Sequence, residues 1–314
     1  MNTDYSRHPV DIFSEFVLYC IAKSQSLDVI CRRWAIWPCS NPDTAFRGRV
    51  LPSWIGVPSF LQSELSSPAP CVSAFSLVGT PHQPVYTASQ GFCANGKKES
   101  DILEVKGLLL GIIDECARVT EAIITSDSLE ILGWTGSLSD GVPDKLWRSL
   151  VANRTTDGRK LPGWYRRACA LALTKPTSDG DMDIQSLLTG IPQPSTLVEY
   201  LKRVEEVTLG RKVFQSTRHC SDPTHAHGSG STETLQLLVG LGPREMMPGD
   251  MVCILFGCSV PVILRPSHQD GIGEKRHLVK LIGEAYLHDH MEGEALAGLG
   301  REEVERQSVT FMIY

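Results

Sequence analysis

The sequence predicts an α+β protein in which helical segments precede a mostly antiparallel β-module. Residues 251–256, 260–265 and 278–286 form short apolar runs that are rich in β-branched residues and bounded by Gly, Pro or Asp. Such runs are typical of buried strands joined by tight turns. Residues 126–209 carry helical patterns instead, and a helical apolar stripe lies near the start of the chain. Because the two kinds of pattern occupy different parts of the chain, we predict the α+β class.

The first 95 residues predict one helix followed by an irregular segment. Pro9 suits the first position of a helix, and an apolar stripe follows at helical spacing, made by Val10, Phe13, Val17 and Ile21. Residues 26–30 indicate a short turn into a strand. Residues 35–90 are rich in Pro and Ser, so we expect loops there, with short strands near 53–54 and 84–86.

The middle of the chain predicts a series of helices. Residues 143–151 and 164–173 are amphipathic, and the Pro176 region ends the second of these segments. Thr196 and Glu199 have the spacing of a capping box, which predicts the start of a third helix with a buried stripe.

These patterns divide the chain into three segments. We predict an N-terminal helix with irregular structure over 1–95, a mostly helical middle over 96–209, and a β-module over 210–314. With 314 residues and 42% hydrophobic content, the chain can bury a sizeable core. The three segments can also form one compact unit.

Charge and cysteine content restrict the classes of function and location. The net charge of −6 argues against a nucleic-acid partner, because nucleic-acid-binding proteins are usually basic. The longest apolar runs are far shorter than the ~20 residues that a membrane helix needs, and the N-terminus has no secretory pattern. The ten cysteines are scattered and form no CxxC pair, so we expect free thiols and a cytoplasmic protein.

Several motifs of the chain fall in the order of one known pattern. They are Asp4-Tyr5-Ser6, Leu51-Pro52-Ser53-Trp54, the segment 211–217, Gly240-Leu241-Gly242-Pro243, Gly249-Asp250, 260–266, Gly283-Glu284-Ala285-Tyr286 and Gly293-Glu294-Ala295-Leu296. The chain thereby resembles the C-terminal region of fungal heterokaryon incompatibility (HET) domain proteins, without their N-terminal HET domain. The resemblance implies a stand-alone relative of that region, and none of these motifs is a catalytic signature.

One cluster of side chains near the C-terminus has the composition of an acid–base site. His288, His290 and Glu292 lie close together in the sequence, and paired His and carboxylate groups serve general acid–base chemistry. The resembling pattern has His-Gly-Ile here, so His290 departs from it. The alternative is the start of a helix, where the carboxylates of this segment favour the helix dipole.

Two further candidates are Arg265 and Glu284, which come from segments predicted as neighbouring strands. We expect them to form a buried ion pair and to lie near the His288 cluster. Such pairs more often fix a core geometry than catalyse.

Metal and nucleotide sites have weaker signals. His225 and His227 form a His-x-His pair that reaches one Zn²⁺ if the chain is extended. The Gly/Ser run that follows favours an inserted loop, so we predict no metal site. Residues 91–98 nearly match a phosphate-binding loop, but Lys98 replaces the Ser/Thr and a strand follows. We therefore expect a hairpin loop and no cofactor.

Two functions remain open from the sequence. The first is a non-catalytic interaction or regulatory module with a protein partner. The second is an enzyme of fungal secondary-metabolite biosynthesis, of the cyclase, isomerase or hydrolase type, acting on a small-molecule metabolite. Such an enzyme needs only a pocket and one or two polar groups on this scaffold.

Overall fold

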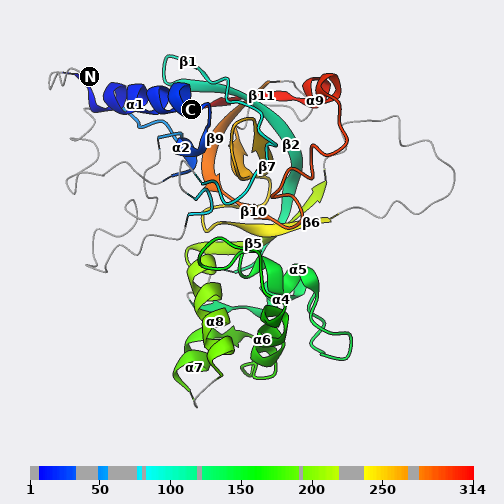
Figure 1. Ribbon diagram of the computed structural model, residues 1–314. Helices are drawn as coiled ribbons and strands as arrows, with labels where there is room; N and C mark the ends of the chain where they lie inside the picture. The colour runs from blue at the N-terminus through cyan, green and yellow to red at the C-terminus, as the bar shows by residue number, and fades with distance from the viewer. Residues whose placement is uncertain are drawn as a thin grey trace.

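A computed structural model describes residues 7–32, 49–55, 76–79, 83–118, 122–190, 194–218, 237–267 and 276–314. It confirms the α+β class. Figure 1 shows a strongly curved sheet with a group of helices below it, next to strands β5 (Arg211–Arg218) and β6 (Leu237–Pro243).

The sheet holds nine strands among the described residues. Their order is β10-β6-β5-β2-β11-β9-β8-β7, and β1 pairs with β2 in addition. The bounds of the other strands are Lys97–Glu99 (β1), Ile102–Cys116 (β2), Met251–Leu255 (β7), Val262–Pro266 (β8), Arg276–Glu284 (β9), Tyr286–Leu287 (β10) and Val309–Ile313 (β11). All pairings are antiparallel except that of β11 with β9.

Strand β2 closes this sheet into a barrel. Its first half pairs with β11, and its second half lies between β5 and β7. The pairing of β2 with β7 joins the β7 end of the strand order back to β2, so the sheet has no free edge there. Register shifts near Leu109 and Ile113 let this 15-residue strand bend. Strand β2 belongs to the segment 96–209, which we predicted as mostly helical, and it joins the β-module instead of the helices.

The three C-terminal runs that predicted strands are β7, β8 and β9 with β10. The last run is interrupted at Ala285, whose N–H donates to the carbonyl of Pro261 at 2.8 Å. This break turns the chain, so that β9 pairs with β8 and β10 pairs with β6. Gly240 makes the second pairing possible, because a Cβ on it would lie 2.2 Å from the Tyr286 carbonyl oxygen.

The predicted helical middle is present below the barrel. It consists of α4 (Ser126–Ile131), α5 (Asp144–Ser149), α6 (Trp164–Leu173), α7 (Ile184–Thr189) and α8 (Ser195–Thr208), with a small sheet of β3 (Ile123–Ile124) and β4 (Met182–Asp183). The capping box predicted at Thr196 does not form. Helix α8 begins at Ser195, and its N-cap is Pro194, two residues before Thr196, with no side-chain cap.

Helix α1 (Pro9–Ser24) begins as predicted, and the segment after it differs from the prediction. Residues Asp28–Cys31 form the short helix α2 instead of a strand. The Ser26 hydroxyl accepts the N–H of Asp28 at 3.0 Å and turns the chain before it. The Asp28 carboxylate then accepts the N–H of Ser259 at 2.7 Å, which fixes α2 to the barrel. Residues 53–54 lie in a turn, and no strand covers 84–86.

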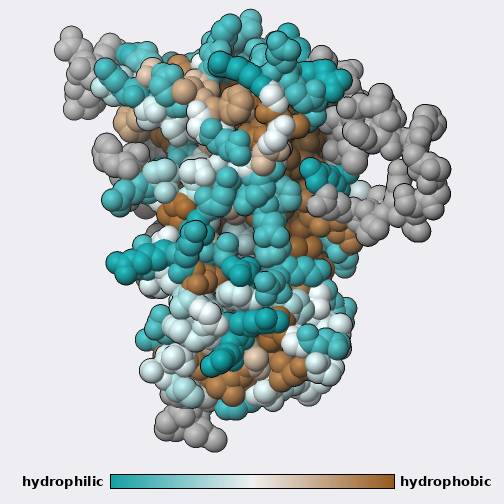
Figure 2. All heavy atoms as spheres, turned by 45° about the vertical axis from the view of Figure 1, so that its right-hand side comes forward, coloured by the Kyte–Doolittle hydropathy of each residue, from teal (hydrophilic) through white to brown (hydrophobic). Residues whose placement is uncertain are grey.

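One hydrophobic core runs through both the barrel and the helices. It contains Val252 and Leu264 from the barrel together with Leu146 and Leu201 from the helices. A smaller cluster lies beside α9 (Arg301–Gln307), formed by Leu108, Phe256, Leu296 and Val304. Figure 2 shows polar side chains over much of one face, with apolar patches in both the upper, barrel part and the lower, helical part.

The loop at 91–98, the cysteines and the helix lengths were also subjects of prediction. Lys97 and Lys98 lie in β1 and β2 follows directly, so 91–98 leads into a hairpin as predicted. The described cysteines are free thiols, and Cys39, Cys71 and Cys220 lie outside the described residues. Of the helices in the described ranges, none has the length and apolar character to cross a bilayer.

Candidate functional site between the barrel and the helices

His288 follows β10 directly and lies where the barrel meets helix α5. Its backbone N–H donates to the Val239 carbonyl of β6 at 3.0 Å, which fixes its place next to the sheet. Its Nδ1 atom lies 3.4 Å from the Tyr286 hydroxyl, and its Nε2 atom lies 3.4 Å from the Asp289 carboxylate. Asp289 has a φ of +57°, a left-handed conformation that is uncommon for a non-glycine residue.

Burial lowers the pKa of His288 below its ordinary value near 6.5. The neighbouring charges oppose one another: Asp289 and Asp144 raise this pKa, whereas Arg148 and His290 lower it. The net lowering keeps the imidazole neutral at pH 7. Burial also raises the pKa of Tyr286 well above its usual value, so its hydroxyl keeps its proton.

His290 and Glu292 lie close to His288 in the turn before α9. The Nδ1 atom of His290 lies 2.9 Å from the His288 carbonyl oxygen. Glu292 accepts hydrogen bonds from Thr87 at 3.2 Å and from the guanidinium of Arg154. Residues 288–300 form turns, and α9 starts only at Arg301. The alternative prediction of a helix start at 289–294 is therefore wrong.

Glu284 is engaged in a different, buried set of contacts. Arg211 donates to one of its oxygens at 2.7 Å, and the side chains of the two residues are 6% and 11% exposed. The backbone N–H of Leu77 and the hydroxyl of Ser76 also donate to this carboxylate, at 2.9 and 3.2 Å. Glu284 therefore joins β5, β9 and the 76–79 segment.

Arg265 pairs with Asp250. The pair of Arg265 with Glu284 that we expected from the sequence does not form. Two nitrogens of Arg265 donate to the Asp250 carboxylate at 2.8 and 2.9 Å, and one also donates to the Glu245 carbonyl at 2.8 Å. The register explains the difference, because Arg265 faces Lys280 across β8 and β9, whereas Glu284 faces Val262. The Asp250 side chain is 1% exposed, so the carboxylate of this pair has almost no contact with water.

The structure thus brings together only part of the predicted cluster. His288, His290 and Glu292 share one turn, whereas Arg265 and Glu284 take part in two separate ion pairs. His225 and His227 lie outside the described residues. Within the described ranges, no three His, Cys, Asp or Glu side chains lie close enough to hold a metal ion.

The sequence reasoning missed the groups that surround His288 and Glu292. Asp144 and Arg148 lie on α5, and Arg154 follows that helix, so their approach depends on how the helices dock on the barrel. The sequence carried one signal for Asp144 and Arg148, which have the i, i+4 spacing of an ion pair on a helix. In the structure their side chains lie 3.7 Å apart. Arg211 and Asp250 had a clearer signal, since both belong to the motifs of the HET-like pattern.

Residues 222–305 match the Het-6 beta-barrel domain. The matched range contains β6 to β10 and the His288 turn. This match and the relative described next confirm the resemblance to HET proteins in the C-terminal part of the chain.

One characterised relative was also found. "Heterokaryon incompatibility protein 6, OR allele" of Neurospora crassa is 34% identical over 79 residues, which are 25% of this chain and 11% of the relative. The matched part thus spans about a tenth of that protein's length. No solved structure matches the chain.

The closed sheet extends beyond the part that matches the Het-6 beta-barrel domain. Strands β2, β5 and β11 lie outside residues 222–305, and yet β2 pairs with β7 and β11 pairs with β9. Arg211, which binds Glu284, comes from β5 as well. The barrel therefore needs residues on both sides of the matched range.

Proposed function

We propose that the chain is a non-catalytic interaction or regulatory module of the HET-related kind, working with a protein partner in the cytoplasm. One observation carries the proposal. The charged residues of the HET-like motifs pair with one another, Arg211 with Glu284 and Asp250 with Arg265. These side chains therefore have structural partners that join separate strands.

A catalytic acid or base must reach the proton that it transfers on a bound substrate. Glu284 accepts hydrogen bonds from three protein groups, and Glu292 accepts from two. The proposal treats both carboxylates as links between elements. Free thiols among the described cysteines support the cytoplasmic location, because disulfides are rare in reducing compartments.

The alternative is an enzyme of fungal secondary-metabolite biosynthesis, acting on a small metabolite. One observation favours it: His288 lies between the Tyr286 hydroxyl and the carboxylate of Asp289, whose backbone is strained. A neutral imidazole held by two polar groups has the form of a general base. The high pKa of Tyr286 makes the hydroxyl a poor acid partner at pH 7.

Complementation in the native host separates the two functions. Three strains would be made from one that lacks the gene. Each would express one tagged protein: the wild type, the His288→Gln variant or the His290→Ala variant. The metabolites of each strain would be profiled, and proteins crosslinked to the tag would be identified by mass spectrometry. The proposal predicts that all three proteins restore the same metabolite profile and retain the same crosslinked partner.

The contrary result is equally specific. If a folded and abundant His288→Gln or His290→Ala protein left a metabolite missing, as in the deletion strain, the enzyme function would replace this proposal. Melting temperatures of the purified variants show whether they fold. His290→Ala is the safer variant, because that side chain is more exposed to solvent than the core residues around it.

A further inference from the structure

A cavity lies in the helical part, away from the candidate residues of the barrel. It has a volume of about 320 Å³ and lies between α4, α6 and the loop that leads into β4. Small-molecule pockets start at about 300 Å³, so this cavity has room for a small organic group. None of His288, His290, Glu292, Glu284 or Arg265 lines it.

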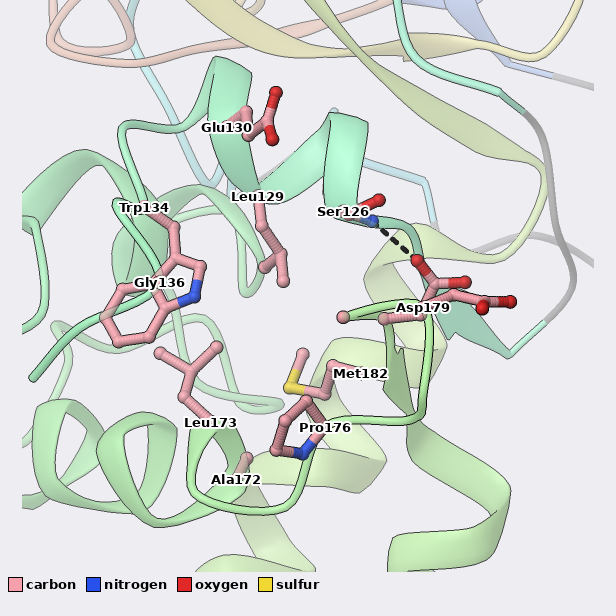
Figure 3. Close-up of a pocket in the computed structure, with 12 residues that line it drawn as sticks. Ser126, Leu129, Glu130, Trp134, Gly136, Ala172, Leu173, Pro176, Asp179 and Met182 are labelled. Carbon is pink, nitrogen blue, oxygen red and sulfur yellow. Dashed lines mark hydrogen bonds between the residues drawn. The ribbon is translucent and has the colours of Figure 1, made fainter.

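The inner wall of the cavity is apolar and aromatic. Figure 3 shows the side chains of Leu129, Trp134, Leu173 and Met182 around one common space. Leu129, Leu173 and Met182 are buried, and Trp134 is partly exposed. Trp134 follows α4 after Gly133, whose φ of +82° ends the helix, and the Trp134 N–H donates to the Leu129 carbonyl at 2.8 Å. This short turn holds the indole ring beside the helix.

The rim of the cavity is acidic. Glu130, Asp179 and Asp181 line it, and Glu130 and Asp179 are exposed. Asp181 also accepts the N–H of Ser126 at 2.7 Å, so it fixes the loop to α4. Cationic side chains also lie near the cavity: Arg118 is paired with Asp127 at 2.8 Å, and the end of the Lys145 side chain, with its Nζ, lies beside Gly133.

We propose that this cavity binds an ammonium or guanidinium group carried on an apolar stem. The apolar wall takes the stem, and the Trp134 ring and the rim carboxylates attract the positive head group. A neutral or anionic ligand of the same shape gains nothing from the rim. The ligand is either a free organic amine or the Lys or Arg side chain of a peptide, since both present the same chemistry.

Binding of 2-phenylethylammonium to the whole protein tests the proposal. Tryptophan fluorescence and calorimetry would measure its Kd, with 2-phenylethanol as the neutral counterpart. We expect saturable binding at or below about 1 mM for the amine, and binding at least about threefold weaker for the alcohol, as a rim ion pair is worth up to ~1 kcal/mol. Equal affinities, or no saturation by the amine up to about 10 mM, would reject the cation site.

Three variants locate the binding. Trp134→Leu and Asp179→Asn should each raise the Kd of the amine about two- to fivefold, in line with an exposed cation–π or ion-pair contact. Asp157→Asn makes the same charge change in an exposed turn that does not line the cavity, and it should leave the Kd unchanged. If Asp157→Asn weakened binding as much as Asp179→Asn, the effect would come from net charge and the site would be wrong.

Capped Lys and Arg tripeptides separate the two sources of the cation, with n-pentylammonium as the competing free amine. Displacement of 2-phenylethylammonium by the peptides, at the concentration at which n-pentylammonium displaces it, indicates a peptide ligand. Displacement only by n-pentylammonium indicates a metabolite. Displacement by neither would contradict the shared head-group chemistry. These outcomes do not depend on the function proposed for the barrel.

Discussion

At the scale of single residues, buried carboxylates in this protein pair with arginines from other strands. Arg211 and Glu284 connect β5 to the end of β9, and Arg265 and Asp250 connect β8 to the start of β7. A buried ion pair adds little net stability compared with apolar residues, but leaving one partner alone is costly. The charges therefore select one arrangement of the strands.

Replacing Glu284 with Gln should destabilise the protein strongly. Gln keeps an oxygen for the Leu77 N–H but leaves the buried Arg211 without its counter-charge. We expect the free energy of unfolding to fall by about 3 kcal/mol, measured by urea denaturation. Glu302→Gln, at an exposed position in the first turn of α9, should lower it by less than about 1 kcal/mol. Equal effects of the two substitutions would mean that the Arg211–Glu284 pair is not structural.

His288 should make stability depend on pH. Its pKa is lower in the folded protein than its ordinary value near 6.5, so the unfolded chain binds more protons in the interval between these two values. The stabilisation by His288 is complete above about pH 6.5 and decreases as the pH falls towards the folded pKa.

Comparison of variants isolates this contribution. The free energy of unfolding of the wild type should fall more between pH 7.5 and 5.5 than that of His288→Gln. His290→Gln should keep most of the wild-type pH dependence, because it retains His288 and burial, the largest cause of the lowered pKa of His288. If His288→Gln kept the full pH dependence, other groups would be responsible.

At the scale of secondary-structure elements, sequence patterns predicted most helices and strands, and contacts with distant residues decided the rest. The apolar runs of β7 and β8 and the stripe of α1 were predicted because burial imposes a period on the sequence. Helix α2 was missed because Ser26 and the Asp28–Ser259 bond shape it, and the second bond spans 231 residues. The β9–β10 break was missed because Ala285 meets Pro261 only in the folded barrel.

Gly240 lies in strand β6 at a position with no space for a side chain. An added Cβ would lie 2.2 Å from the Tyr286 carbonyl oxygen and 2.9 Å from the Phe214 ring. Gly240→Ala should therefore disrupt the β6–β10 pairing and lower the free energy of unfolding by about 3 kcal/mol.

A matched glycine provides the control for this prediction. At Gly300, the N-cap of α9, an added Cβ would have no atom within 4 Å and φ is negative, so Gly300→Ala should lower the free energy of unfolding by no more than about 1 kcal/mol, the cost of a weaker N-cap. Denaturation curves of both variants are the measurement. A Gly240→Ala protein as stable as the wild type would mean that β6 and β10 do not pair as described.

At the scale of the whole molecule, the barrel and the helices share one core, so we expect them to unfold together. Three of the six tryptophans, Trp134, Trp147 and Trp164, lie in the helical part, so tryptophan fluorescence weights that part, whereas far-ultraviolet circular dichroism reports on both parts. The two signals should change at the same urea concentration. Separate transitions would instead support independent domains, with a boundary such as the one predicted at residue 209.

The candidate site shows the limit of sequence reasoning at this scale. His288, His290 and Glu292 share one turn because they lie within five residues of one another. Arg265 and Glu284 were paired incorrectly, because their partners depend on strand register and on β5 and the turn before β7. The cavity beside Trp134 had no sequence signal, since its walls come from two helices and a loop.

The central claim is that the charged motif residues hold the barrel together and do no chemistry. The double variant Arg211→Met, Glu284→Gln tests it most directly, because it removes both charges and keeps an acceptor for the Leu77 N–H. Relative to Glu284→Gln alone, it should recover most of the lost free energy of unfolding. In the deletion strain it should also restore the wild-type metabolite profile and crosslinked partner. A double variant as stable as the wild type that leaves the deletion phenotype in place would contradict this account.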